Sequence, residues 1–204
     1  NGCHEYAFMK WPTSYPLLLA ISYTFFGVSE TTAFMLVRVL SSLSVVIMFL
    51  IGYLLTKNKI IGIYGALILT FVPMHIIWSS TTASEPVFMV LSLITFLCLL
   101  IAIKIRTWEM QALFMLSLAF AVQARAEGGI LIPVMLSALI LLDRKWLDNI
   151  IKFRLIWVLF FILLIPYLVH IHYSAIYDTW GSNGEKFSLD FVKNNMTTNL
   201  KFWI

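Results

Sequence analysis

Apolar residues occur in long runs along the chain, and short polar stretches separate the runs. A helix needs about 20 consecutive, largely apolar residues to cross the hydrocarbon core of a bilayer. The pattern therefore predicts an all-α, polytopic transmembrane bundle with six spans, at residues 32–55, 60–78, 87–105, 110–123, 129–142 and 155–172. The fourth and fifth runs are short, which predicts the two legs of a tight helical hairpin whose tip does not fully leave the protein.

A shorter apolar run, residues 15–26, precedes the first span. Pro12 and Pro16 mark its start and Gly27 its end, as the usual helix punctuation requires. Its length is about half that of a span, which favours a helix lying in the membrane interface. A seventh, tilted span is the alternative.

The basic residues predict the orientation of the chain. If residue 1 starts outside the cytoplasm, one set of connections holds most of the Lys and Arg, and positive charge favours the cytoplasmic side. These residues are Lys57, Lys59, Lys104, Arg106, Arg144, Lys145, Lys152 and Arg154. The chain then divides into an outer-face segment (1–31), the bundle (32–172) and the start of an extracytoplasmic loop or domain (173–204). We expect a cell-membrane protein that is an internal fragment of a longer one.

The composition supports the membrane assignment. Hydrophobic residues make up 61% of the chain and charged residues only 12%, against roughly 45–50% and 25% in soluble domains. The formal charge of +4 is accounted for by topology, and no nucleic-acid partner is expected.

Ionisable residues gather in the predicted outer segments. At the mouth of an apolar bundle a charged side chain has a high free-energy cost unless it is paired, is hydrated or has a function. The candidates for function on this side are His4, Glu5, Lys10, Glu85, Arg125, Glu127, His170 and His172. Arg38 lies just inside the first predicted span. It either reaches the outer interface with its long side chain or pairs with an outer acid such as Glu85.

Each candidate also has a purely structural interpretation. Ser84 or Glu85 would cap a helix that starts at Pro86, and the carboxylate would complement the helix dipole. Arg125 and Glu127 would form a local ion pair at a turn made flexible by glycines. Alternatively, Arg125 would bind a phosphate, because its planar, permanently charged group suits phosphate oxygens.

Four stretches, in order, carry a resemblance to a known superfamily. They are Lys10-Trp11-Pro12-Thr13-Ser14-Tyr15-Pro16, Ser29-Glu30 through Arg38, Trp78-Ser79-Ser80 through Glu85-Pro86, and Ala124-Arg125-Ala126-Glu127-Gly128. Together they resemble the GT-C membrane glycosyltransferases, in the branch of protein O-mannosyltransferases and lipid A aminoarabinose transferases. Each stretch is weak alone, and their order and shared face give the combination its specificity.

The resemblance implies transfer of a sugar from a polyprenyl-phosphate-linked donor to an acceptor at the extracytoplasmic face. Lys10 and Arg125 would bind the donor phosphate, Glu85 would be the second acidic residue of the catalytic site, and Arg38, Glu127 and Glu5 would support them. A divalent metal is left open, with Glu85, His4, His170 and His172 as candidate ligands.

One departure from the family pattern is serious. The family's catalytic Asp lies upstream of the Lys-x-Pro stretch, and no Asp precedes Lys10 here. We therefore expect the fragment to lack the base and to be inactive. The rival interpretations are a piece of a transporter or lipid flippase, whose ionisable residues would line the middle of spans, and a non-catalytic membrane scaffold.

Overall fold

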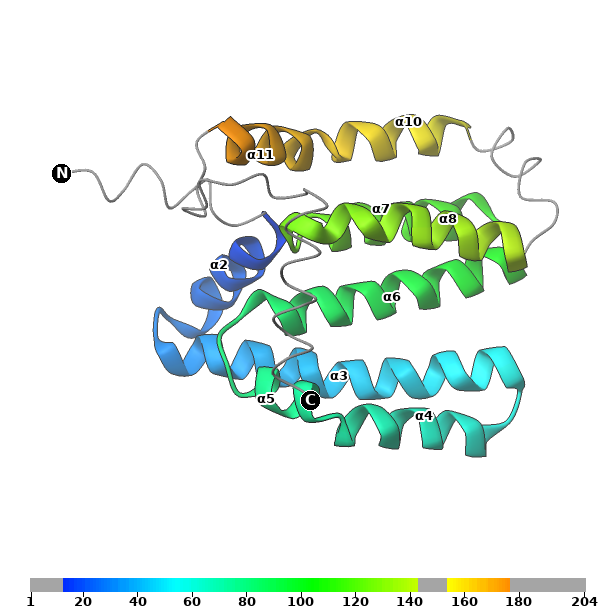
Figure 1. Cartoon of the computed structure of the whole chain (residues 1–204), viewed down its shortest axis with the longest axis horizontal. Coiled ribbons are helices and arrows are strands. Elements are labelled where there is room, and N and C mark those ends of the chain that lie inside the picture. The colour runs from blue at the N-terminus through cyan, green and yellow to red at the C-terminus, as the bar shows by residue number, and fades with distance from the viewer. Residues whose placement is uncertain (1–12, 143–153, 177–204) are drawn as a thin grey trace, which may run out of the picture.

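The computed structural model describes residues 13–142 and 154–176, and within these ranges the chain is a bundle of helices (Figure 1). The helices are α2 (Ser14–Phe26), α3 (Glu30–Thr56), α4 (Lys59–Phe71), α5 (Pro73–Ser79), α6 (Ser84–Ile105), α7 (Trp108–Val122), α8 (Leu131–Leu142), α10 (Arg154–Leu163) and α11 (Ile165–Ile176). A short 3-10 helix, η1 (Ala126–Ile130), joins α7 to α8.

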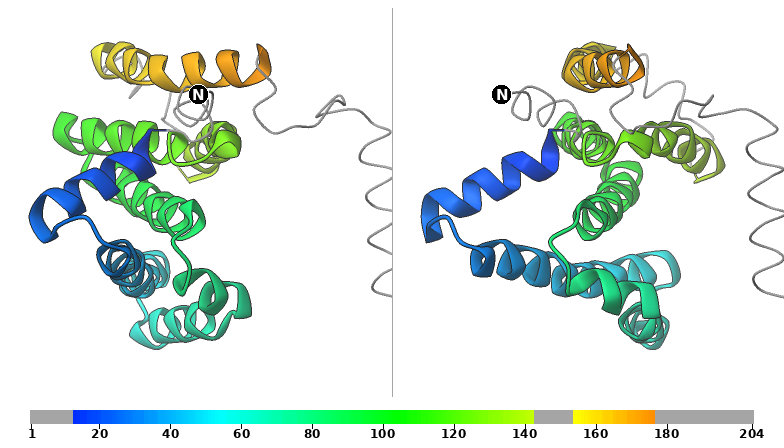
Figure 2. Two further views of the ribbon diagram at one scale, coloured as in Figure 1. Left: turned by 90° about the vertical axis from the view of Figure 1, so that its left-hand side faces the viewer. Right: turned by 60° about the vertical axis from the view of Figure 1, so that its left-hand side comes forward.

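The long helices lie side by side in the order α4, α3, α6, α7 and α10 (Figure 1). The α4–α3 and α6–α7 pairs are antiparallel, whereas α3 runs parallel to α6 and α7 runs parallel to α10. The α2 helix runs obliquely from the end of α7 to the start of α3 (Figure 2). One end of the bundle therefore holds the start of α3, the connection from α5 to α6, the turn from α7 to η1 and the end of α11. We call it the hairpin end. The described parts of the predicted outer segments thus lie at one end of the bundle, and that this end faces outward stays a prediction.

Large apolar side chains cover the outside of the bundle as well as its core. Ile68, Phe71 and Leu155 are exposed, whereas Val37, Leu99 and Phe114 are fully buried. Exposed apolar surface on this scale needs lipid rather than water around it. Within residues 13–142 and 154–176, three helical stretches are long and apolar enough to cross a membrane: α3, α6 and Arg154–His172.

The second predicted span is not straight. The α4 and α5 helices pass the same test only together, and a bend of 63° separates them. Pro73 causes the break, because it lacks a backbone N–H and forces the preceding Val72 into an extended conformation. The prediction of one continuous helix at residues 60–78 is wrong in this respect.

The fourth and fifth predicted spans are short helices. The α7 helix has 15 residues, and η1 with α8 forms a second apolar stretch, Ala126–Leu142. Their arrangement as two legs of a hairpin is confirmed (Figure 1).

The helix ends follow from local chemistry. Ser29 caps α3, with its hydroxyl accepting a hydrogen bond from the Thr32 N–H at 3.1 Å. The α2 helix ends as predicted at Gly27, whose φ of 80° suits a residue without a side chain. At about 20 Å, α2 is shorter than the hydrocarbon core, in keeping with the interfacial assignment.

Candidate functional site

The centre of the candidate site is the turn between α7 and η1, which carries Arg125. This residue has an extended backbone, with φ −143° and ψ 156°, and it separates the two helical legs. Its side chain is 29% exposed and turns toward the start of α6. There the Nη1 atom of Arg125 lies 2.7 Å from Oε1 of Glu85, whose side chain is 27% exposed.

A second carboxylate completes the cluster. The Nε–H of Arg125 donates to Oε2 of Glu127 at 3.2 Å, so the predicted local ion pair at the hairpin tip is confirmed. Burial favours loss of charge, but the two carboxylates outweigh it and raise the pKa of Arg125. Burial likewise tends to raise the pKa of Glu127, but a backbone hydrogen bond and Arg125 outweigh it and lower the pKa. The guanidinium has five N–H donors, and these two contacts leave others to bind an anion.

The helix-cap interpretation of Glu85 is wrong. The α6 helix begins at Ser84, its N-cap residue is Ala83, and no side chain caps it. Glu85 lies in the first turn, where a negative charge still complements the helix dipole. Its carboxylate is engaged in the ion pair with Arg125 rather than in a cap.

Arg38 lies apart from this cluster. Its side chain is exposed, and its guanidinium carbon lies 6.0 Å from the centroid of the Phe34 ring. Within the described residues Glu85 pairs with Arg125 and not with Arg38, so the proposed pairing of Arg38 with Glu85 is wrong. The helix from Arg38 to Lys57 is about 28 Å long, close to the thickness of the hydrocarbon core. Arg38 is therefore placed to reach the membrane interface at the hairpin end.

The α2 helix brings a residue that the sequence analysis missed. Ser14 anchors α2 to the end of α7, donating from its backbone N–H to the Gln123 carbonyl at 3.0 Å and from its hydroxyl to the Phe120 carbonyl at 2.6 Å. The next residue, Tyr15, is close enough to Glu85 to be affected by its charge. Burial, then Tyr23 and Glu85, raise the pKa of Tyr15. Its hydroxyl therefore remains protonated at neutral pH.

The hairpin tip is held by the last span. The Tyr167 hydroxyl donates to the Ala126 carbonyl and accepts from the Gly129 N–H, both at 2.7 Å. Neither Gly128 nor Gly129 has a positive φ, so these glycines permit close packing rather than a flexible turn. A buried Tyr usually finds a hydrogen-bond partner, and a Tyr inside an apolar run is a signal by which Tyr167 could have been found.

The two histidines of the last span are poor joint metal ligands. His170 and His172 lie two residues apart in α11, which remains helical to Ile176, so they point in different directions. No group of three His, Cys, Asp or Glu side chains suited to a metal occurs within residues 13–142 and 154–176. Glu85, His170 and His172 therefore do not make such a group, and the predicted metal site, which also includes His4, stays a prediction.

Three predicted site residues, His4, Glu5 and Lys10, lie outside the described residues. Within the described residues, the predicted cluster thus consists of Arg125, Glu85 and Glu127. Tyr15 approaches it, and Tyr167 braces the turn from behind.

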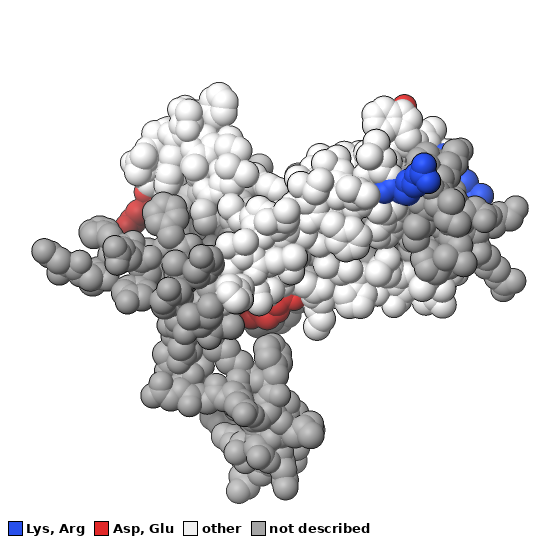
Figure 3. Space-filling view, turned by 90° about the horizontal axis from the view of Figure 1, so that it is seen from above, with Lys and Arg blue, Asp and Glu red and all other residues white. Residues whose placement is uncertain are grey.

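The other end of the bundle carries mainly basic side chains. Seen from the side of α10 and α11, the surface is mostly uncharged, and the Lys and Arg atoms in view gather at the end where α10 begins (Figure 3). At this end Lys104 lies close enough to Lys57 to lower its pKa through a side-chain hydrogen bond and charge repulsion. Helix α6 extends about 28 Å from Glu85 to Lys104, so the two charged ends lie one hydrocarbon thickness apart.

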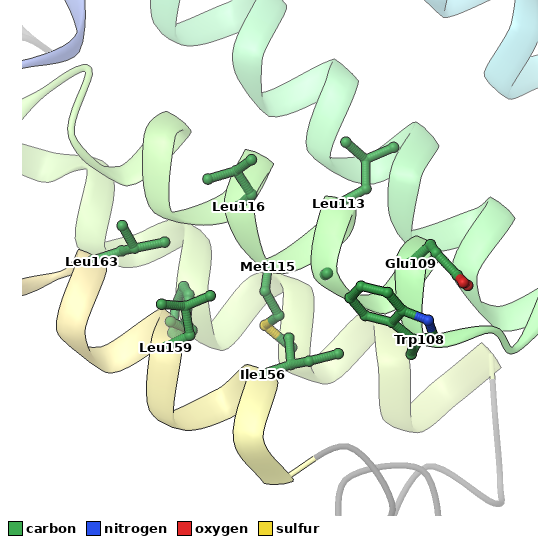
Figure 4. A pocket seen from close by; sticks show the side chains of 10 residues that line it. Trp108, Glu109, Leu113, Met115, Leu116, Ile156, Leu159 and Leu163 are labelled. Carbon is green, nitrogen blue, oxygen red and sulfur yellow. The ribbon is translucent and has the colours of Figure 1, made fainter.

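A cavity of about 310 Å³ lies between α7 and α10 (Figure 4). Its lining is almost wholly apolar and includes Leu113, Met115, Ile156 and Leu159, with Trp108 and Glu109 at one end. Neither Arg125 nor Glu85 lines it. The cavity is therefore apolar and lies apart from the polar cluster.

The comparisons with known proteins are consistent with this geometry. The family model for dolichyl-phosphate-mannose-protein mannosyltransferase matches residues 10–170, which is most of the chain. No curated protein and no solved structure gives a significant match.

Proposed function

This chain belongs to the dolichyl-phosphate-mannose-protein mannosyltransferase family, and we propose from that premise that it carries the donor-phosphate site of a polyprenyl-phosphate-dependent sugar transferase. It is an integral membrane glycosyltransferase of the GT-C type. We infer that the donor is a polyprenyl-phosphate-linked sugar, and mannose is the first candidate. The reaction takes place at the extracytoplasmic face of the membrane, at the hairpin end.

The observation that carries the proposal is the ion pair between Arg125 and Glu85. Glu85 holds the guanidinium on the bundle, and the remaining N–H donors of Arg125 are available for phosphate oxygens. A planar guanidinium suits this task because it binds phosphate with paired hydrogen bonds. Glu85 then has a positioning role, in place of the catalytic role first assigned to it.

In the reaction, an acceptor hydroxyl oxygen bonds to the anomeric carbon of the sugar while the bond from that carbon to the phosphate oxygen breaks. The hydroxyl proton passes to a general base, and the bonding electrons leave with the polyprenyl phosphate. Arg125 stabilises the negative charge that develops on the phosphate. Such placed charges commonly contribute the largest share of catalysis.

The general base belongs, by the family pattern, to an Asp upstream of Lys10. Within the described residues, the carboxylates of Glu85 and Glu127 are both engaged by Arg125, so neither is assigned the role of general base. Lys10 is the second donor-phosphate residue in this scheme.

The test uses the full-length protein in lipid nanodiscs with a polyprenyl-phosphate-linked mannose. Arg125→Ala should lower kcat/KM about 100-fold, the usual effect of removing one group that stabilises transition-state charge. Arg125→Lys should recover part of the loss, because it restores the charge but not the paired geometry. Arg154→Ala, at the opposite end of the bundle, is the matched control and should leave transfer unchanged.

Transfer that is undiminished in a folded Arg125→Ala protein would reject the phosphate role of this residue. Steady transport of a substrate across a sealed membrane, with no sugar transferred, would favour the transporter alternative.

A further inference from the structure

Tyr167 connects two parts of the molecule that are distant in sequence. Its ring belongs to α11 in the last span and is only 5% exposed. Its hydroxyl group donates to the Ala126 carbonyl and accepts from the Gly129 N–H. Both partners lie immediately after Arg125, in the short η1 helix.

The two glycines of the tip are required by these contacts. A Cβ atom on Gly129 would lie 2.7 Å from the Tyr167 hydroxyl oxygen, with the nearest ring carbons at 3.4 and 3.5 Å. A Cβ atom on Gly128 would run into the Val122 carbonyl oxygen at the end of α7. The tip is thus packed against α7 on one side and against α11 on the other.

A second connection secures the residues before Arg125. The Gln123 side chain donates from Nε2 to the Leu163 carbonyl at 3.1 Å. Leu163 lies one helical turn before Tyr167, so the last span bonds to the hairpin on both sides of Arg125. Arg125 itself has an extended backbone, and its carbonyl accepts the first hydrogen bond of η1, from the Gly128 N–H at 3.0 Å.

We propose that Tyr167 is a positioning residue for Arg125. It acts through the backbone of Ala126 and Gly129 and keeps the guanidinium at the place where the donor phosphate binds. The inference rests on the proposed function in taking Arg125 as the phosphate ligand. A small displacement of such a group has a large effect, since a misplacement of about 1 Å can cost roughly 100-fold in rate.

The first experiment measures transfer by Tyr167→Phe in the full-length protein in nanodiscs, with a polyprenyl-phosphate-linked mannose. We expect kcat/KM to fall about 10-fold, because Phe keeps the buried ring and removes only the bridging hydroxyl. Tyr64→Phe is the matched control. Tyr64 is 61% exposed on α4, so removal of its hydroxyl should leave kcat/KM unchanged.

Coupling to Arg125 separates positioning from general support. In an Arg125→Lys background, Tyr167→Phe should cause less than a two-fold further loss, because Tyr167 acts through the guanidinium that Lys has replaced. A merely structural role predicts the same 10-fold loss in both backgrounds. Equal losses would therefore overturn the proposal, as would an unchanged rate in Tyr167→Phe alone.

The contact with Gly129 gives a test that needs no activity. Gly129→Ala should lower the melting temperature clearly in the wild-type background, because its methyl group meets the hydroxyl. The same change should be better tolerated with Tyr167→Phe, where only ring carbons at ordinary contact distance remain. An equal effect in the two backgrounds would show that the hydroxyl does not occupy this place.

Hydrogen exchange distinguishes failure of this inference from failure of the proposed function. The backbone amides of Ala126–Ile130 should exchange faster in Tyr167→Phe than in wild type, whatever the substrate. If wild type transfers no sugar yet this difference is seen, the proposed function fails while the brace on the tip stands. If exchange is unchanged, Tyr167 does not position the tip.

Discussion

The guanidinium of Arg125 lies 2.7 Å from the carboxylate of Glu85, although one residue follows α7 and the other lies in the first turn of α6. This contact joins the hairpin tip to the bundle. It also holds a permanent positive charge at the hairpin end, where we propose that the lipid-linked phosphate binds. Both side chains are partly buried, so each depends on the other for compensation of its charge.

A double-mutant cycle at this pair should show strong coupling. Arg125→Ala and Glu85→Ala should each destabilise the protein in detergent, and the double variant should lose less than the sum. We expect a coupling free energy of roughly 0.5–3 kcal/mol, the range for residues in contact. Thermal unfolding of the four proteins provides the measurement, and Glu30→Ala, an acid at the start of α3, serves as the control. Strictly additive losses would mean that the pair does not form.

Close packing at the tip predicts a sharp response to Gly128→Ala. The added methyl group would meet the Val122 carbonyl, which is backbone and cannot move aside cheaply. We expect a loss of about 1–3 kcal/mol, typical of overpacking. The control is Gly65→Ala on α4, where the nearest atom is a Met48 side-chain carbon at 3.8 Å. Similar melting temperatures for the two variants would contradict the packing of the tip.

The Arg125–Glu127 pair predicts how stability depends on pH. The folded pKa of Glu127 is lowered, so its stabilising contribution is complete above the ordinary Glu pKa of about 4.3 and is lost as the pH falls through the lower folded value. The gap in melting temperature between wild type and Glu127→Gln should be constant from pH 7 to 5 and should close in more acid solution. The gap should be small, since the Glu127 side chain is 65% exposed. A gap that already closes between pH 7 and 5 would contradict this assignment.

Membrane topology can be tested by labelling with a charged thiol reagent. In a variant without native cysteines, Lys57→Cys should react only from the cytoplasmic side and Thr82→Cys only from the opposite side, because α3 and α6 present these positions at opposite ends of the bundle (Figure 1). Cys98, restored alone, is buried and should remain unlabelled. Labelling of positions 57 and 82 from the same side would overturn the orientation.

The sequence was most informative about elements whose chemistry is local. Ser29 and Glu30 mark the start of α3, and Gly27 ends α2, because caps and turns involve neighbouring residues. Pro73 was a local signal too, and the apolar run around it concealed the break that it causes. Glu85 was misread as a helix cap, since Ser84-Glu85-Pro86 fits that pattern and the competing partner lies on another helix.

The sequence by itself determined that this chain is a membrane-embedded helical bundle with Glu85 and Arg125 in connections at the same end. In lipid each apolar segment must satisfy its own backbone hydrogen bonds as a helix, and successive crossings alternate in direction, so spacing alone groups the polar connections. Only the tertiary structure decided that Arg125 meets Glu85 and that Tyr167 braces Gly129. Such pairings depend on which helices are neighbours and how each is rotated about its axis, and neither property is encoded in the distance between two residues along the chain.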